Sequence, residues 1–101
     1  MAIITLTSDW GLSDYYVPIV KGAIYSALPN ANIVDITHNI EPFDIRSAAF
    51  IVKNCYKSFP KGSIHILAID TEESKENPHV LLKANDHYFI GTDNSIFSLI
   101  I

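Results

Sequence analysis

Two apolar, β-prone runs that each end abruptly in an aspartate constrain the fold of this chain most. The first run covers residues 3–7 and leads to Asp9, and the second covers residues 64–69 and leads to Asp70. Buried parallel strands have this continuous apolar character, and their carboxyl ends meet at one edge of a sheet. In open α/β sheets that edge carries the ligand crevice. The two carboxylates therefore predict a site for a hydroxylated or cationic ligand.

Helical and strand patterns alternate between these two runs. Apolar residues at helical spacing predict a helix over residues 16–28, with Pro18 in its first turn, where a missing N–H costs least. A second strand is expected over residues 33–37. A second helix is expected over residues 45–59, with Asp44 as its N-cap.

The end of the chain predicts a hairpin and one more helix. Residues 80–84 and 87–90 flank an Asn-Asp turn signal, and Asp93 or Asn94 is expected to cap a short last helix. The order strand-helix-strand-helix-strand-hairpin-helix predicts an α/β fold, a three-layer αβα sandwich around a mostly parallel mixed sheet.

We interpret residues 1–101 as one amino-terminal α/β domain, because a chain of 101 residues suffices for a single domain. The sequence stops within the apolar run 96–101, without a polar tail. Natural chain ends are usually exposed and polar. We therefore expect this chain to be the front part of a longer protein.

Composition and charge exclude several classes of function. Hydrophobic residues make up 49% of the chain, which supports a packed core. The formal net charge is −4, with seven Lys and Arg, so no nucleic acid partner is expected. The sequence contains no membrane-length apolar run and no signal-peptide pattern, so we expect no membrane association and a cytoplasmic location. The single cysteine, Cys55, is interpreted as a buried, inert thiol.

Common catalytic and nucleotide-binding motifs are missing from the sequence. It contains no G-x-G-x-x-G, no G-x-x-x-x-G-K-[ST] and no G-x-S-x-G. The four histidines lack metal-ligand spacing, so no metal site is expected. His38 is expected to make a strand-end hydrogen bond, and Asp35 beside it is interpreted as a structural polar residue. A phosphoacceptor receiver domain needs an acidic pair after its first strand, whereas Asp9 is followed by Trp10 and Gly11.

Six short segments, in order along nearly the whole chain, are similar to those of one family. They are Thr7-Ser8-Asp9-Trp10-Gly11-Leu12, Tyr16-Val17, Lys21-Gly22, Ile33-Val34-Asp35-Ile36-Thr37-His38, Phe59-Pro60-Lys61-Gly62-Ser63 and Ile90-Gly91-Thr92-Asp93-Asn94-Ser95. With these segments the chain resembles the amino-terminal domain of the S-adenosyl-L-methionine hydroxide adenosyltransferases, which are relatives of the fluorinase and chlorinase enzymes.

The resemblance implies an activity and an assembly. In this family water or hydroxide displaces methionine from the ribose 5′ carbon of S-adenosyl-L-methionine, so that adenosine forms, and the reaction needs no metal or cofactor. The resemblance also implies a second, β-rich domain and a homotrimer, with substrate bound between one subunit's first domain and a neighbour's second. We therefore expect the full-length parent to hydrolyse S-adenosyl-L-methionine and residues 1–101 alone to be inactive.

The resemblance assigns substrate contacts to residues at the predicted sheet edge. Asp9 matches the family aspartate that grips the ribose 2′ and 3′ hydroxyls, and capping of the following loop is the alternative. Trp10 and Phe43 are expected beside the substrate. A plain core position explains Phe43 equally well.

The resemblance gives Asp70 the catalytic role of helping to position the attacking water, since it matches the aspartate that opens a family Asp-Pro-Gly-Val-Gly loop. This sequence departs from that pattern, because residues 71–74 contain neither glycine nor proline and the family arginine falls on Asn77. Glu72 and Glu73 would attract a sulfonium and repel a hydroxide, or they form a solvated acidic loop. The alternative functions are a catalytically silent nucleoside-binding module and a domain that serves only trimer assembly.

Overall fold

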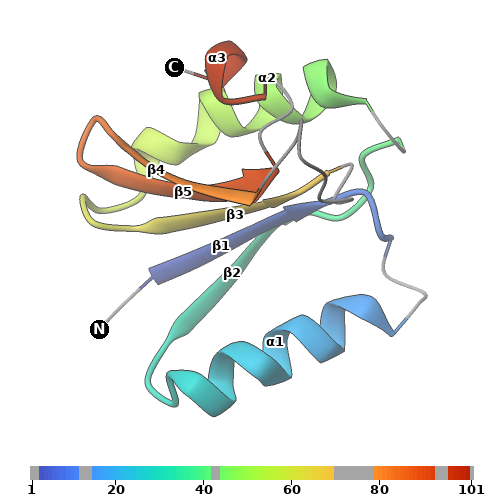
Figure 1. The fold of residues 1–101 in the computed structure, drawn as a ribbon, viewed down its shortest axis with the longest axis vertical. Coiled ribbons are helices and arrows are strands. Elements are labelled where there is room, and N and C mark those ends of the chain that lie inside the picture. Colours follow the sequence, from blue (N-terminus) through green and yellow to red (C-terminus); the bar gives the residue numbers. More distant parts are fainter. Residues whose placement is uncertain (1–2, 12–14, 42–43, 70–78, 93–95, 101) are drawn as a thin grey trace.

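The computed structural model describes residues 3–11, 15–41, 44–69, 79–92 and 96–100. Within these ranges the chain forms one five-stranded sheet with helices on both faces (Figure 1). The elements follow in the order β1 (Ile3–Ser8), α1 (Tyr16–Ala27), β2 (Asn32–Thr37), α2 (Ile45–Cys55), a 3₁₀ turn η1 (Tyr56–Ser58), β3 (Ile64–Ala68), β4 (His79–Ala84), β5 (His87–Thr92) and α3 (Ile96–Ile100). The predicted α/β fold with a mostly parallel mixed sheet is confirmed.

The strand order creates a reversal at the centre of the sheet. The strands lie in the order β2-β1-β3-β5-β4, and every neighbouring pair is parallel except β4 with β5. From β1 the chain first moves outward to β2 and then crosses back to β3 on the other side of β1. Ligands of open α/β sheets bind at such a switch point, outside the carboxyl ends of the strands. The switch point of this sheet lies between β1 and β3.

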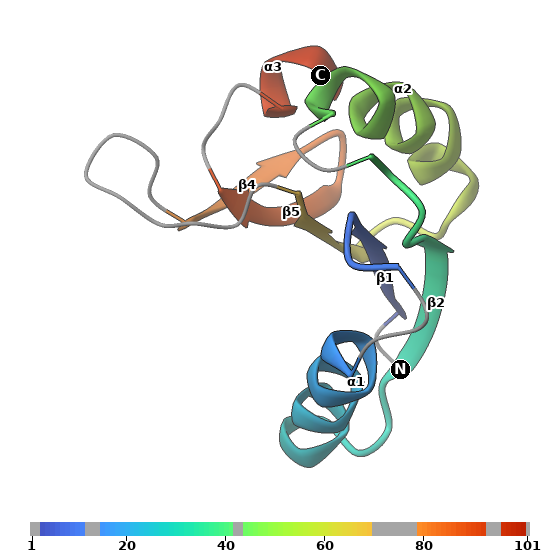
Figure 2. The ribbon, with the colours of Figure 1, turned by 90° about the vertical axis from the view of Figure 1, so that its right-hand side faces the viewer.

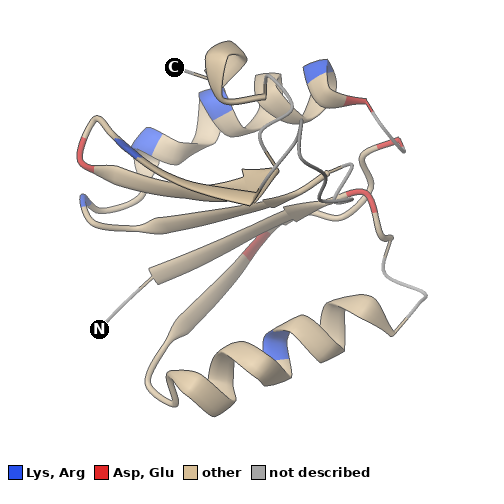
Figure 3. Cartoon of the chain, viewed as in Figure 1, with Lys and Arg blue, Asp and Glu red and all other residues tan. Residues whose placement is uncertain are grey.

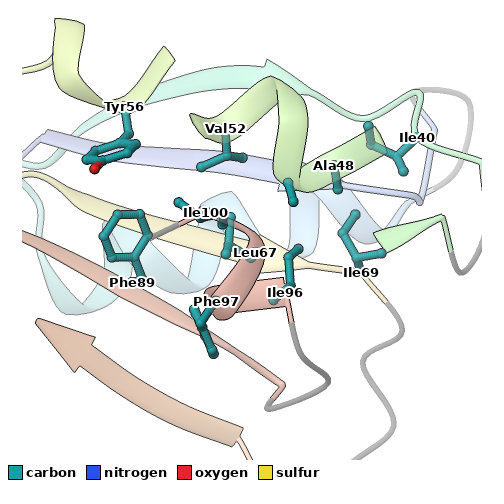
Figure 4. Packing of buried hydrophobic residues seen from close by; sticks show 11 residues of the cluster. Ile40, Ala48, Val52, Tyr56, Leu67, Ile69, Phe89, Ile96, Phe97 and Ile100 are labelled. Carbon is teal, nitrogen blue, oxygen red and sulfur yellow. The ribbon is translucent and has the colours of Figure 1, made fainter. Parts of the chain in front are cut away.

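The main core fills the space between the sheet and two of the helices. Helix α1 lies on one face of the sheet, and α2 with α3 lies on the opposite face (Figure 1, Figure 2). The buried residues of this cluster are Ile40, Ala48, Ala49, Val52, Tyr56, Leu67, Ile69, Phe89, Ile96, Phe97 and Ile100 (Figure 4). Helix α2 contributes Ala48, Ala49 and Val52, whose spacing places them on one face of the helix.

Helix α1 is buried less than its apolar spacing predicts. Val17 is its one buried residue, whereas Ala23 and Ala27 on the predicted apolar stripe are exposed. Tyr16 and Ile19 also keep about half of their surface exposed, at 46% and 59%. The helix therefore presents a broad apolar surface.

Local sequence signals explain the ends of several elements. The Asp44 carboxylate accepts a hydrogen bond from the Ser47 N–H at 3.1 Å, which confirms the predicted N-cap. The β4–β5 hairpin turns through Asn85 and Asp86, both at positive φ, as a two-residue turn requires. The second helix changes to 3₁₀ geometry at Tyr56, earlier than its predicted end.

Two further features concern the thiol and the membrane. Cys55 is half-buried, so it is more exposed than the buried thiol that the sequence predicts. None of the helices in the described ranges is both long and apolar enough to cross a bilayer.

Candidate functional site

The loop that follows β1 occupies the switch point of the sheet. The Asp9 N–H donates a hydrogen bond to the carbonyl oxygen of Ala68, the last residue of β3, at 3.4 Å. Two residues later the Gly11 N–H donates to the His38 carbonyl oxygen at 2.7 Å. Gly11 has φ +74, a left-handed conformation that glycine adopts without strain. The loop over residues 9–11 is therefore attached to both strands that flank β1.

An apolar cleft opens beside this loop. It has a volume of about 270 Å³ and lies at the carboxyl ends of β3 and β5. Trp10 lines it together with Ile66, Leu67, Ala68, His79, Ile90, Gly91 and Thr92. The Trp10 ring also packs on Tyr16 of α1, with 5.9 Å between ring centroids. A flat, partly apolar ligand group fits a cleft of this character.

A chain of polar side chains runs from α1 to the loop. The Lys21 ammonium donates to one carboxylate oxygen of Asp35 at 2.6 Å, and His38 Nε2 contacts the other at 2.7 Å. His38 Nδ1 contacts the Ser8 hydroxyl, and the Trp10 N–H donates to the same hydroxyl oxygen at 3.4 Å. This polar chain of side chains connects α1, β2 and β1 to Trp10, the residue that follows Asp9.

A bulge in β2 explains how this polar chain forms. The parallel pairing with β1 shifts between Leu6 and Thr7, so that Leu6 faces Asp35 while Thr7 faces Thr37. Side chains three residues apart point to opposite faces of a regular strand. The extra residue and the strand end at Thr37 bring Asp35 and His38 to the same side. Bulges commonly redirect side chains in this way beside functional sites.

The Asp35 carboxylate is held in its charged form. Partial burial raises its pKa, but the hydrogen bonds from Lys21 and His38, together with the charge of Lys21, outweigh that effect. The pKa of Asp35 is consequently lowered from its ordinary value. The side chains of Lys21 and Asp35 remain 33% and 38% exposed, so solvent screens this ion pair.

The described residues at the carboxyl edge of the sheet are acidic. Asp9 follows β1, and Glu41 and Asp44 follow β2, while Arg46, the second residue of α2, is the nearest basic residue along the chain. Figure 3 shows acidic segments where β1 and β2 end, one within β2 and one at the β4–β5 turn, and basic segments along α1, α2 and the opposite end of the sheet. A cationic ligand is favoured at such an edge.

The structure describes part of the predicted site. It places Asp9 and Trp10 together at the predicted edge, both half-buried. Phe43 and Asp70 lie outside the described residues, as do the predicted capping residues Asp93 and Asn94 and the loop with Glu72, Glu73 and Asn77. The predicted hydrogen bonds of Asp35 and His38 are confirmed.

Sequence reasoning missed three residues of the site. Ser8 and Lys21 fall in two of the family-like segments, but their partners lie 30 and 14 residues away, so the sequence does not show what they bind. Thr92 lines the cleft, and its buried hydroxyl has no hydrogen-bond partner among the described residues. Within the described ranges, no three His, Cys, Asp or Glu side chains lie close enough together to hold a metal ion.

Comparisons with known proteins identify relatives of the chain. The model of the S-adenosyl-L-methionine hydroxide adenosyltransferase N-terminal domain matches residues 4–101. An (R)-S-adenosyl-L-methionine hydrolase of Methanocaldococcus jannaschii is 34% identical over 97% of this chain and 39% of its own length. A fluorinase of Nocardia brasiliensis is 36% identical over 61% of this chain and 21% of its own length.

A solved structure shares the fold. The crystal structure of an uncharacterized conserved protein from Thermotoga maritima superposes with a TM-score of 0.86 at 32% identity, covering 97% of this chain and 38% of that one. The chain thus spans less than two fifths of the length of these relatives.

Proposed function

Because the chain belongs to the S-adenosyl-L-methionine hydroxide adenosyltransferase family, we propose that the full-length protein hydrolyses S-adenosyl-L-methionine to adenosine and methionine. The observation that carries the proposal is the position of Asp9, on a loop attached to β3 and β2 at the switch point of the sheet. Relatives named as S-adenosyl-L-methionine hydrolases support the same reaction.

Asp9 binds the ribose in this proposal. A carboxylate has two acceptor oxygens and can accept hydrogen bonds from the 2′ and 3′ hydroxyls together. This arrangement fixes the sugar, and with it the direction of the bond between C5′ and sulfur. Trp10 and the adjacent cleft supply apolar surface for the ligand. The acidic edge favours the positively charged sulfonium.

The reaction is a displacement at C5′. The oxygen of water forms a bond to C5′ while the bond between C5′ and sulfur breaks, and the electron pair of that bond goes to sulfur. Methionine leaves as a neutral thioether, the water releases one proton, and no general acid is needed. Alignment of the water, C5′ and sulfur is the main contribution of the protein, and alignment can lower a barrier by several kcal/mol. In the proposal Asp70 helps to position the water.

Adenosine release by the full-length protein tests the proposal. Incubation with S-adenosyl-L-methionine should yield adenosine and methionine in equal amounts by chromatography. D9N should lose most of this activity, whereas D86N, at the opposite end of the sheet on the hairpin turn, should retain it. Absence of adenosine above the blank would contradict the proposal.

A nucleoside-binding module without catalysis is the second candidate. The loop over residues 71–74, which lacks the family's proline and glycines, favours it. Calorimetry with S-adenosyl-L-methionine should then show binding without turnover. Absence of heat for both S-adenosyl-L-methionine and adenosine would exclude this module as well.

The proposal includes a homotrimer of the full-length protein, with each site shared between subunits. The exposed apolar side chains of Tyr15, Tyr16, Ile19 and Tyr25 on and before α1 are consistent with contact to another protein surface. Light scattering of the full-length protein should give three times the mass of one subunit. Residues 1–101 alone should release no adenosine, and robust activity of this segment would contradict the shared site.

A further inference from the structure

His38 is attached to the loop after β1 by two independent contacts. Its backbone carbonyl accepts the Gly11 N–H at 2.7 Å, and its Nδ1 contacts the Ser8 hydroxyl directly before Asp9. The His38 side chain is buried, with 3% of the residue exposed. The contacts therefore fall on both sides of Asp9, one residue before it and two residues after it.

The hydrogen bonds of this polar chain have a defined direction. The Asp35 carboxylate can only accept, so His38 Nε2 carries a proton toward it. In the neutral ring Nδ1 is then an acceptor, and the Ser8 hydroxyl donates to it. The Ser8 oxygen keeps a lone pair for the Trp10 N–H. Each group in the chain is thereby satisfied, and the tautomer of His38 is fixed by Asp35.

Lys21 and Asp35 extend the chain to α1. Lys21 donates to Asp35 at 2.6 Å, so the carboxylate that orients His38 is itself held by a residue of α1. An imidazole oriented by a carboxylate also occurs in nucleophilic Ser-His-Asp sites. Ser8 cannot act as a nucleophile here, because the residue is 1% exposed. The polar chain therefore serves to hold the loop that follows β1.

We infer that His38 is a positioning residue that presents the Asp9 carboxylate to the ribose, through its contacts to Ser8 and Gly11. This inference rests on the proposed function, because it takes Asp9 as the ribose-binding group. His38 itself does not touch the substrate. Without its side chain the loop loses one of its attachments, and the carboxylate is no longer held at the switch point. Removal of the His38 side chain should therefore weaken only the hydrogen bonds between Asp9 and the ribose hydroxyls, and no other contact to the ligand.

Paired ligands isolate this effect in the full-length protein. Adenosine carries the 2′ and 3′ hydroxyls, and 2′,3′-dideoxyadenosine lacks both. Calorimetry should show that wild type binds adenosine much more tightly than the dideoxy ligand. H38A should weaken adenosine binding about tenfold, the size of one lost hydrogen bond, and leave the dideoxy affinity within twofold. T37A is the matched control, since it removes a hydrogen bond to the Asn39 N–H at the same strand end and should change neither affinity.

Each outcome separates the positioning role from the proposed function. Equal affinity of wild type for the two ligands would overturn the ribose role of Asp9, and the inference with it. Discrimination by wild type that H38A retains in full would overturn the inference alone. A parallel loss for both ligands would show a merely structural role and overturn it too. If H38A does not fold, S8A replaces it, since this variant removes only the hydroxyl that His38 contacts. The affinities of S8A for adenosine and 2′,3′-dideoxyadenosine are then compared in the same way.

Discussion

Acid should destabilise this domain through a buried pair of histidines. His65 is 0% exposed, and its Nδ1 contacts the Thr5 hydroxyl at 2.7 Å while its Nε2 contacts His87 Nδ1 at 3.0 Å. Burial and the neighbouring charge of His87 lower the pKa of His65 to about 4. Burial also lowers the pKa of His87, against the opposing charge of Asp86. The contact between the two rings needs one donor and one acceptor, so it excludes protonation of both.

The size of the effect follows from the pKa difference. The unfolded chain binds a proton at His65 below its ordinary pKa of 6.5, whereas the folded chain resists protonation until about pH 4. The unfolded state therefore binds more protons in this window, and the free energy of unfolding falls as the pH falls. The difference between the His65 pKa values of the unfolded and folded chain corresponds to about 3 kcal/mol of unfolding free energy. This is a large fraction of the stability of a small domain.

Urea unfolding between pH 7 and pH 4, followed by Trp10 fluorescence, measures this loss. The free energy of unfolding of the wild-type domain should fall by about 3 kcal/mol more than that of H65Q, which titrates no ring at this position. H79Q replaces an exposed histidine of β4 and should keep the wild-type slope. The comparison with H65Q also removes the effect of Asp35, whose lowered pKa costs stability at still lower pH. Equal slopes for wild type and H65Q would refute the reasoning.

Three substitutions test packing and the site. G91A should lower the free energy of unfolding by about 1–3 kcal/mol, because a methyl group there would lie 2.8 Å from the Leu67 carbonyl oxygen; an unchanged urea midpoint would contradict this close approach. T7V should raise the free energy of unfolding by about 1 kcal/mol, since the buried Thr7 hydroxyl has no partner within the described part of the chain, and a lower urea midpoint would show that the hydroxyl is satisfied. D9N in the full-length protein should weaken adenosine binding roughly tenfold to a hundredfold by calorimetry, and an unchanged affinity would remove Asp9 from the site.

The elements of this fold follow closely from local patterns. The apolar runs that become β1 and β3 need burial on both faces, and a parallel sheet is the arrangement that supplies it. Asp44 and the Asn85-Asp86 turn act within a few residues, so their roles could be predicted without any tertiary information. The exposure of the apolar face of α1 could not be predicted in this way. Helical spacing shows which residues share a face, but it does not show how much of that face the sheet covers.

The site was predictable where it depends on strand ends and unpredictable where it depends on pairing. Asp9 could be placed at the carboxyl edge because it directly follows a buried run. The bulge at residue 36 and the contact of His38 with Ser8 arise from the register between β1 and β2, which the sequence does not display. Lys21 joins the same group only because the fold brings α1 within reach of Asp35 on β2.

A crystal structure of the full-length protein with bound S-adenosyl-L-methionine tests the central claim most directly. We predict the ribose 2′ and 3′ hydroxyls within hydrogen-bonding distance of the Asp9 carboxylate, at the switch point between β1 and β3. A nucleoside bound elsewhere, or an Asp9 side chain turned away from the sugar, would contradict the account.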